Sequence, residues 1–419
     1  MKKALSLSLT AMLLLCSCST PSANDEGGSA EGTETQAVTT TAPAVVAEPR
    51  EETDFDKYVS NTFISTGNNQ FIESADGVTY RAYLPAEEYG TFEYKFYFSN
   101  TVDSTYDKGD LAYVGRSGGN YKIEAAYIAD GGTGPDAQIT NRTPVTFGGS
   151  TEKSVAPNET YWSDPVEFTL SEGSYIVWEW KITGDEIPCT NMSYLTSTTA
   201  DFGTGTFETC DTIPLPQLIG CNRDTKYTVA AIGDSITQGC QTDFMEYQFW
   251  AAKISKKLGA DCGFWNVGLG WSRSSDAAHC GDWVERIKAY DTVIIAFGTN
   301  DIISGPYGAD GGNTAEEIDS YIRTITKELT EAGCEVIIFS APPQSYGTSQ
   351  ENTRNELNYL LSVTAEEYGG MYFDFGGLLG GDDDPAIAKY GAHPNGEGGD
   401  VVSDEFVKQY ADYFAAKCD

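Results

Sequence analysis

Residues after Lys226 alternate between two kinds of segment, and this alternation constrains the fold more than any other feature of the sequence. Short apolar runs rich in β-branched and aromatic residues predict five strands, at 227–233, 262–268, 291–298, 334–343 and 371–375. Segments with apolar residues at helical spacing lie between and after them, at 243–259, 277–290, 315–333, 353–369 and 401–417. Strands that alternate with helices form a parallel sheet covered on both faces. We therefore predict an α/β fold, a five-stranded parallel sheet in a three-layer α/β/α, flavodoxin-like domain.

The residues between Phe55 and Asn222 follow a different pattern. Short aromatic and β-branched runs, such as 78–84 and 91–100, alternate at period two and are separated by Gly, Asn, Asp and Pro. No helical segment of useful length interrupts them, so the sequence predicts an all-β sandwich or jelly roll. Trp178 and Trp180 share one face of a predicted strand, which favours a place in the core over a sugar-stacking platform.

The first residues have the pattern of a secretory signal: two lysines, a short apolar stretch and then Cys16 and Cys18. The end of this stretch resembles a bacterial lipobox with Cys18 as the acylated residue, and ordinary secretion with cleavage nearby is the alternative. Residues 19 to about 50 contain too few aromatic residues to order themselves. The predicted organisation is a lipoprotein signal at 1–18, a disordered tether at 19–54, the β-sandwich at 55–222 and the α/β domain at 223–419. This predicts an extracellular protein, anchored by lipid to the surface of a bacterial cell.

The net charge of -36 argues against nucleic acid as a partner, because no local basic patch offsets it. We expect membrane contact only through the lipid anchor. Of the ten cysteines, those outside the signal are even in number, which suggests disulfides in an exported protein. Cys189 and Cys210 are the preferred local pair, and free buried thiols are the alternative.

Four short motifs follow predicted strands or precede the last helix, so the topology brings them to one end of the sheet. They are GDSIT around Ser235, NVGLG with Gly268, GTND with Asn300, and HPNGEGG beginning at His393. In order and spacing these motifs resemble the sequence blocks of the SGNH/GDSL hydrolase family, over roughly residue 228 to the C-terminus. Residues 140–184 also resemble the amino-terminal β-domain of some secreted esterases of this type.

The resemblance and the chemistry imply the same roles. Ser235 attacks an ester carbonyl and forms an acyl-enzyme, while His393 removes the serine proton and later protonates the leaving alcohol. The backbone N–H groups of Ser235 and Gly268 and the side-chain amide of Asn300 form the oxyanion hole. The other histidine, His279, lies in a predicted helix, so His393 is the expected base.

The sequence departs from the family pattern at one position. Tyr390 stands three residues before His393, where the family usually has an aspartate that orients the imidazole. We favour a Ser–His dyad in which a backbone carbonyl orients the ring. The alternative is a displaced acid from 382–384, of which Asp384 is the nearest in sequence.

These features predict a serine carboxylester hydrolase that removes acetyl or other small acyl groups from extracellular carbohydrate. The alternatives are a lipase, arylesterase or thioesterase on small or lipid esters, and an inactive carbohydrate-binding lipoprotein. We expect a monomer whose partner is an acylated small molecule or polysaccharide. No metal or organic cofactor is expected, because serine acyl transfer needs neither. A chain that starts near Arg223 is expected to keep ester hydrolysis.

Overall fold

The computed structural model describes residues 52–104, 114–304, 312–380 and 393–418, all within one compact unit of the chain. Cys18, Asp384, Tyr390 and most of the predicted tether therefore lie outside the described residues. Within the described part, no helix combines the length and apolar character needed to cross a membrane.

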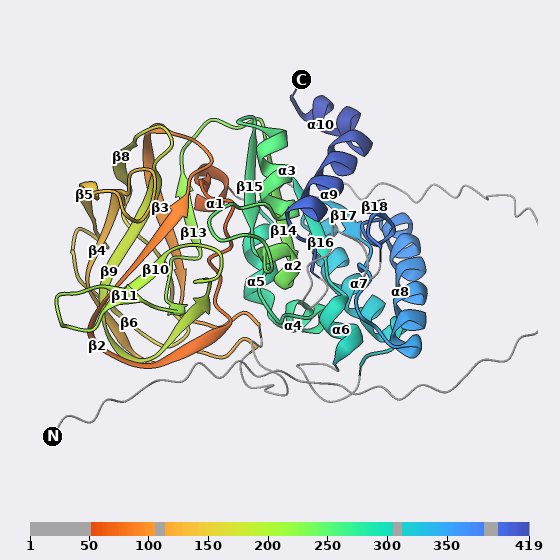
Figure 1. Ribbon diagram of the computed structural model, residues 1–419, viewed down its shortest axis with the longest axis horizontal. Helices are drawn as coiled ribbons and strands as arrows, with labels where there is room; N and C mark the ends of the chain where they lie inside the picture. Colours follow the sequence, from red (N-terminus) through yellow and green to blue (C-terminus); the bar gives the residue numbers. More distant parts are fainter. Residues whose placement is uncertain (1–51, 105–113, 305–311, 381–392, 419) are drawn as a thin grey trace, which may run out of the picture. The chain divides into compact units, whose positions relative to one another are not determined.

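The first half of the described chain is a β-rich region of two antiparallel sheets (Figure 1). One sheet has the order β1-β13-β3-β7 with β8 on β3, and the other the order β11-β10-β2-β9-β4-β5 with β12 on β9 and β6 on β4. Trp178 and Trp180 are 1% and 2% exposed in the core of this region, as predicted. After the short helix α1 (Asp54–Lys57), the strands are β1 Val59–Ser60, β2 Gln70–Pro85, β3 Gly90–Ser99, β4 Tyr121–Asp130, β5 Thr140–Val145, β6 Lys153–Val155, β7 Thr160–Trp162, β8 Val166–Leu170, β9 Tyr175–Asn191, β10 Thr198–Asp201, β11 Glu208–Thr209, β12 Thr212–Ile213 and β13 Leu218–Cys221.

The second half contains the predicted five-stranded parallel sheet, in the order β15-β14-β16-β17-β18. This confirms the α/β fold expected from the alternating pattern. The first strand, β14, covers the predicted residues 227–233 because its apolar run ends at the glycine before the GDSIT serine. The five strands are β14 Tyr227–Gly233, β15 Cys262–Asn266, β16 Thr292–Ala296, β17 Glu335–Phe339 and β18 Met371–Phe373.

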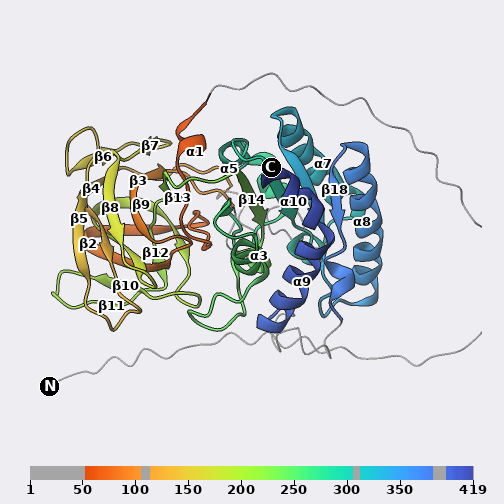
Figure 2. The ribbon, with the colours of Figure 1, turned by 90° about the horizontal axis from the view of Figure 1, so that it is seen from above.

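Helices cover both faces of this sheet (Figures 1 and 2). Alternate residues of β14 separate the two layers: Val229 and Ala231 belong to a core cluster with residues of α3 and α9. Ala230 and Ile232 belong to a second cluster, with residues of α5, α7 and α8. The helices are α2 Ser235–Gln238, α3 Trp250–Leu258, α4 Ser274–His279, α5 Gly281–Ile287, α6 Thr299–Ile303, α7 Ala315–Glu331, α8 Thr348–Glu367, α9 Gly396–Gln409 and α10 Ala411–Cys418.

Four predicted helices differ from those in the structure. The helix expected at 353–369 begins earlier, at Thr348, and ends at Glu367. The helix expected at 243–259 begins only at Trp250, because Met245 and Tyr247 have positive φ angles that no right-handed helix accommodates. The helix expected at 277–290 is divided between α4 and α5 at Cys280. The last helix, expected at 401–417, is divided between α9 and α10 at Tyr410.

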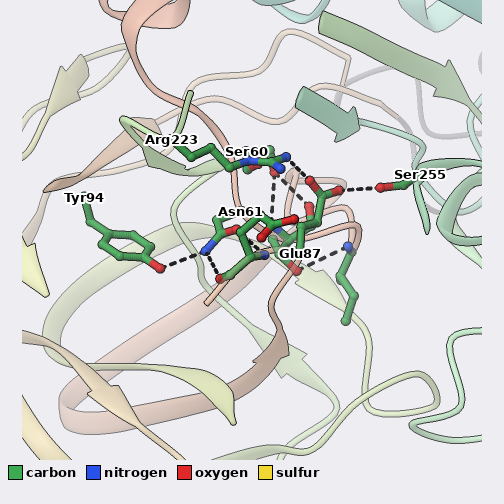
Figure 3. A network of polar contacts seen from close by, with 9 residues as sticks. Ser60, Asn61, Glu87, Tyr94, Arg223 and Ser255 are labelled. Atoms are coloured by element: carbon green, nitrogen blue, oxygen red, sulfur yellow. Dashed lines mark hydrogen bonds and ion pairs between the residues drawn. The ribbon is translucent and has the colours of Figure 1, made fainter. Parts of the chain in front are cut away.

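A buried polar network joins the β-rich region to the α/β region (Figure 3). Glu87 follows β2 and forms an ion pair with Arg223, and both side chains are less than a tenth exposed. Ser255 of α3 donates a hydrogen bond of 2.7 Å to Glu87. Arg223 also donates to the carbonyl of Ser60 at 3.1 Å. Burial raises the pKa of Glu87 to about 7, although the Arg223 charge acts in the opposite direction.

A second buried ion pair lies between the same two regions. Asp103 of the β-rich region pairs with Arg286 of α5, and their side chains are 0% and 3% exposed. Arg286 Nη1 donates to Asp103 Oδ2 at 3.1 Å, and Gln217 Nε2 donates to the same oxygen at 3.3 Å. Each of the two charges thus has its counter-charge in the other region.

Strand β15 is at one edge of the parallel sheet, yet all five of its residues are buried. Strand β1 of the β-rich region lies against it. A Cβ on Gly263 would lie 3.0 Å from the Cβ of Val59, so the two strands approach closely at this glycine. Asn266, the last residue of β15, donates to the carbonyl of Phe63 at 3.3 Å.

The eight cysteines of the described residues are free, including Cys189 and Cys210, the pair favoured from the sequence. Cys189 is buried in the β-rich region, where burial raises the pKa of its thiol. The alternative expectation of free thiols agrees with this structure.

Candidate active site

Ser235 and His393 lie together at the carboxyl end of the parallel sheet. Ser235 is the first residue of α2, which begins directly after β14 and Asp234. His393 precedes α9, whose N-cap residue Asn395 accepts hydrogen bonds from two backbone N–H groups at the start of the helix. The distance between Ser235 Oγ and His393 Nε2 is 2.8 Å. The two side chains, 158 residues apart in sequence, are therefore within hydrogen-bond distance.

Asp234 fixes the backbone that carries the serine. Its side chain caps α2 by accepting the N–H of Ile236 at 2.9 Å. The carboxyl group is 2% exposed, and burial raises its pKa to about 7, with a smaller contribution from the charge of Asp301. Asp301 in turn accepts hydrogen bonds from the backbone and side chain of Ser274, at 3.0 and 2.5 Å.

Gly268 does not offer the free N–H expected for an oxyanion donor. This N–H already donates to Asn266 Oδ1 at 2.9 Å, in a buried position. A Cβ at this glycine would lie 2.7 Å from the Thr237 side chain and 2.9 Å from the backbone nitrogen of Gln238. The glycine is therefore required for the close packing of this loop against α2, not for the approach of an acyl group.

Trp271 is the residue near this position that the sequence analysis missed. Gly270 donates its N–H to Gln238 Oε1 at 2.8 Å. The next N–H, that of Trp271, has no hydrogen-bond acceptor among the described residues. Trp271 has a φ of 67°, which a non-glycine residue rarely adopts, and its side chain is 50% exposed. Its positive φ could not be read from the sequence, in which Gly268 was the residue singled out near this position.

Asn300 lies in α6 and is 6% exposed. Its Nδ2 donates one hydrogen bond, of 2.9 Å, to the carbonyl of Ser272. An amide nitrogen has two hydrogens, so a second donor remains. His279, excluded as a base by the sequence, lies at the end of α4 with Nδ1 2.7 Å from the carbonyl of Ser275.

A pocket of about 390 Å³ opens beside Ser235. Gln238, Gly270 and Trp271 line it from the α/β region. Asn191 and Tyr194, at and just after the end of β9, line it from the β-rich region. Both regions therefore contribute to the wall of the pocket that contains the serine.

Residues 231–401 match the model of the GDSL-like Lipase/Acylhydrolase family. They form a GDSL-like acylhydrolase domain. The match includes all four predicted motifs, and the chain is accordingly a carboxylic ester hydrolase.

Solved structures similar to this chain include three esterases or hydrolases, and the alignment covers almost the whole of each of them. A carbohydrate acetylesterase family member from Sinorhizobium meliloti is 18% identical, with a TM-score of 0.37, over 45% of this chain and 98% of that one. A variant of an acetyl-xylooligosaccharide esterase from Geobacillus is 20% identical, with a TM-score of 0.37, over 45% and 95%. An α/β hydrolase from the metagenome of Lake Arreo is 17% identical, with a TM-score of 0.38, over 45% and 96%. No curated protein matches the chain.

Two further site predictions concern a displaced acid and a metal ion. Asp384, the candidate for a displaced acid, lies outside the described residues. Among the described residues, no group of three or more His, Cys, Asp or Glu side chains is arranged to hold a metal ion.

Proposed function

We propose that this acylhydrolase removes acetyl or other small acyl groups from extracellular carbohydrate, with Ser235 as nucleophile and His393 as base. The observation that carries the proposal is the 2.8 Å distance between Ser235 Oγ and His393 Nε2 beside a pocket of about 390 Å³. A serine hydroxyl is a weak nucleophile at its ordinary pKa, and a base at hydrogen-bond distance activates it.

The first step is attack of Ser235 Oγ on the ester carbonyl while its proton passes to His393 Nε2. The tetrahedral intermediate collapses to an acyl-enzyme when the imidazolium returns this proton to the leaving alcohol. Water, activated by the same imidazole, then releases the carboxylic acid and restores the serine. The Nε2 atom must be unprotonated before attack, so the resting ring carries its proton on Nδ1.

Three N–H groups are candidates for the oxyanion hole. The Ser235 N–H is at the first position of α2 and has no acceptor among the described residues. The second hydrogen on Asn300 Nδ2 is not used by Ser272. We assign the third donor to Trp271 N–H in place of Gly268 N–H, since the latter is committed to Asn266. Loss of one such donor lowers kcat by about 10²- to 10³-fold in related chemistry.

The lining of the pocket supports a polar alcohol. Asn191 and Gln238 offer side-chain amides, and the half-exposed Trp271 lines the same pocket. Amides form hydrogen bonds with hydroxyl groups, and an indole ring packs on the C–H face of a sugar. A long acyl chain fits this mixture of groups less well, which favours carbohydrate esters over lipid esters.

Turnover of esters that differ in acyl length and alcohol tests the proposal. We expect hydrolysis of 4-nitrophenyl acetate well above that of 4-nitrophenyl octanoate, and acetate release from acetylated xylan, mannan, pectin or chitin oligosaccharides. Ser235→Ala should lose several orders of magnitude in kcat. Ser349→Ala, at an exposed serine of α8, should retain wild-type rates. Absence of turnover by the wild type, or a preference for octanoate, would contradict the proposal.

We also propose that the protein acts at the outer surface of a bacterial cell, held by lipid on Cys18. The lipobox-like end of the signal and the tether-like composition that follows it support this location. A monomer without metal or organic cofactor remains the expectation.

A further inference from the structure

Gln238 presents a buried hydrogen-bond donor that the proposed chemistry does not use. It is the last residue of α2, one turn after Ser235, and is 1% exposed. Its Oε1 atom accepts the N–H of Gly270 at 2.8 Å. A backbone N–H can only donate, so this contact identifies the oxygen end of the amide and leaves Nε2 at the other end.

The Nε2 group of Gln238 has no hydrogen-bond partner among the described residues, although it is buried. An amide nitrogen removed from water without a partner destabilises the folded protein. A buried polar group without a partner calls for a specific reason. Here the residue lines the pocket beside Ser235, so a bound substrate is the reason that the geometry favours.

Asn191 brings a second amide to the same pocket from the other region of the chain. It ends β9, and its backbone pairs with Thr212 of β12, which fixes its position. No hydrogen bond joins its side chain to another described residue. The side chain is partly exposed and available to a ligand.

We propose that Gln238 and Asn191 are substrate-positioning residues that bind hydroxyl or ether oxygens of the alcohol portion of the ester. Gln238 Nε2 donates from the floor of the pocket, and the Asn191 amide donates or accepts from the wall formed by the β-rich region. The β-rich region thereby takes part in substrate selection, not only in support of the fold. This inference rests on the proposed function, because it names the part of the substrate that these amides recognise.

The ratio of kcat/KM for an acetylated methyl xyloside to that for 4-nitrophenyl acetate measures this recognition. The nitrophenyl ester has no hydroxyl or ring oxygen, so the ratio reports the contacts of the amides with those oxygens of the xyloside. In Asn191→Ala and in Gln238→Glu, which keeps an oxygen for Gly270 N–H, we expect the ratio to fall five- to tenfold. The fall should come from a higher KM for the xyloside. In Asn352→Ala, at an exposed asparagine of α8, the ratio should not change.

The outcomes separate this inference from the proposed function. If the wild type hydrolyses neither ester, the proposed function fails. If it hydrolyses both and the ratio stays within twofold of wild type in Asn191→Ala and Gln238→Glu, with melting temperatures unchanged, the inference is overturned. If one variant does not fold, the other variant decides. A second measurement, on the wild type, compares inhibition by methyl xyloside with inhibition by cyclohexanol, an alcohol of similar size. Equal inhibition by the two alcohols would also overturn the inference.

Discussion

Removal of one partner from the buried Asp103–Arg286 pair should destabilise the protein strongly. Asp103→Asn preserves the shape of the side chain but leaves the Arg286 guanidinium, whose side chain is 3% exposed, without its counter-charge. Loss of one partner from a buried ion pair costs roughly 3–5 kcal/mol. For a protein of this size, at about 2 °C per kcal/mol, the melting temperature should fall by roughly 6–10 °C.

The control for this experiment is an exposed ion pair. The side chains of Lys408 and Glu405 are 74% and 37% exposed, so Glu405→Gln should change the free energy of unfolding by less than about 1 kcal/mol. The double variant Asp103→Leu/Arg286→Met removes both buried charges and should recover most of the lost stability. Calorimetry and denaturant unfolding of all three variants measure these effects. If Asp103→Asn melts within 2 °C of wild type, or if the double variant is less stable than Asp103→Asn, the reasoning is refuted.

Three further predictions concern the site and the anchor. Asp234→Asn should flatten the pH dependence of stability: the pKa of Asp234 is raised to about 7, so the native protein holds a proton that the unfolded chain has lost, and stability falls as pH rises from about 4 to 7. Urea unfolding at intervals across this range checks the slope, and an unchanged slope in the variant would count against the shift. Asp384→Ala should keep most of kcat while His393→Ala loses several orders of magnitude, if a backbone carbonyl orients the imidazole; a loss at Asp384 of about 10⁴ would instead establish a triad. Cys18→Ala should move the protein from the membrane fraction to the medium or to an unprocessed precursor, whereas unchanged fractionation and no palmitate label would exclude lipidation at this cysteine.

The parallel sheet could be predicted because its signal is local. Each strand after Lys226 is a short apolar run bounded by glycine or polar residues, and the residues of β14 coincide with the prediction. A chain in which strands and helices strictly alternate can adopt only a few topologies. The helix boundaries were harder, since the apolar spacing of 243–259 continues through Met245 and Tyr247, whose backbone is not helical.

The site was predictable only as far as topology brings motifs to one end of the sheet. Ser235 and His393 follow from this rule, and the structure brings them together. The rule does not give the direction of each backbone N–H, so the hydrogen bond from Gly268 N–H to Asn266 Oδ1 could not be predicted. The place of Asn191 in the pocket could not be predicted either, because this residue belongs to a strand of the β-rich region and no local pattern relates it to Ser235.

The packing of β1 against the edge strand β15 has a consequence for folding during synthesis. A parallel sheet leaves unpaired backbone groups along its edge strands, which are templates for association with other chains. The ribosome releases the N-terminal part first, and such parts generally fold as they emerge. Strand β1 is therefore available before β15 has been synthesised, so the vulnerable edge meets its cover on emergence. A circular permutant with residues 223–418 placed ahead of the β-rich region would expose that edge during translation, and its yield would suffer even if the finished molecule were equally stable.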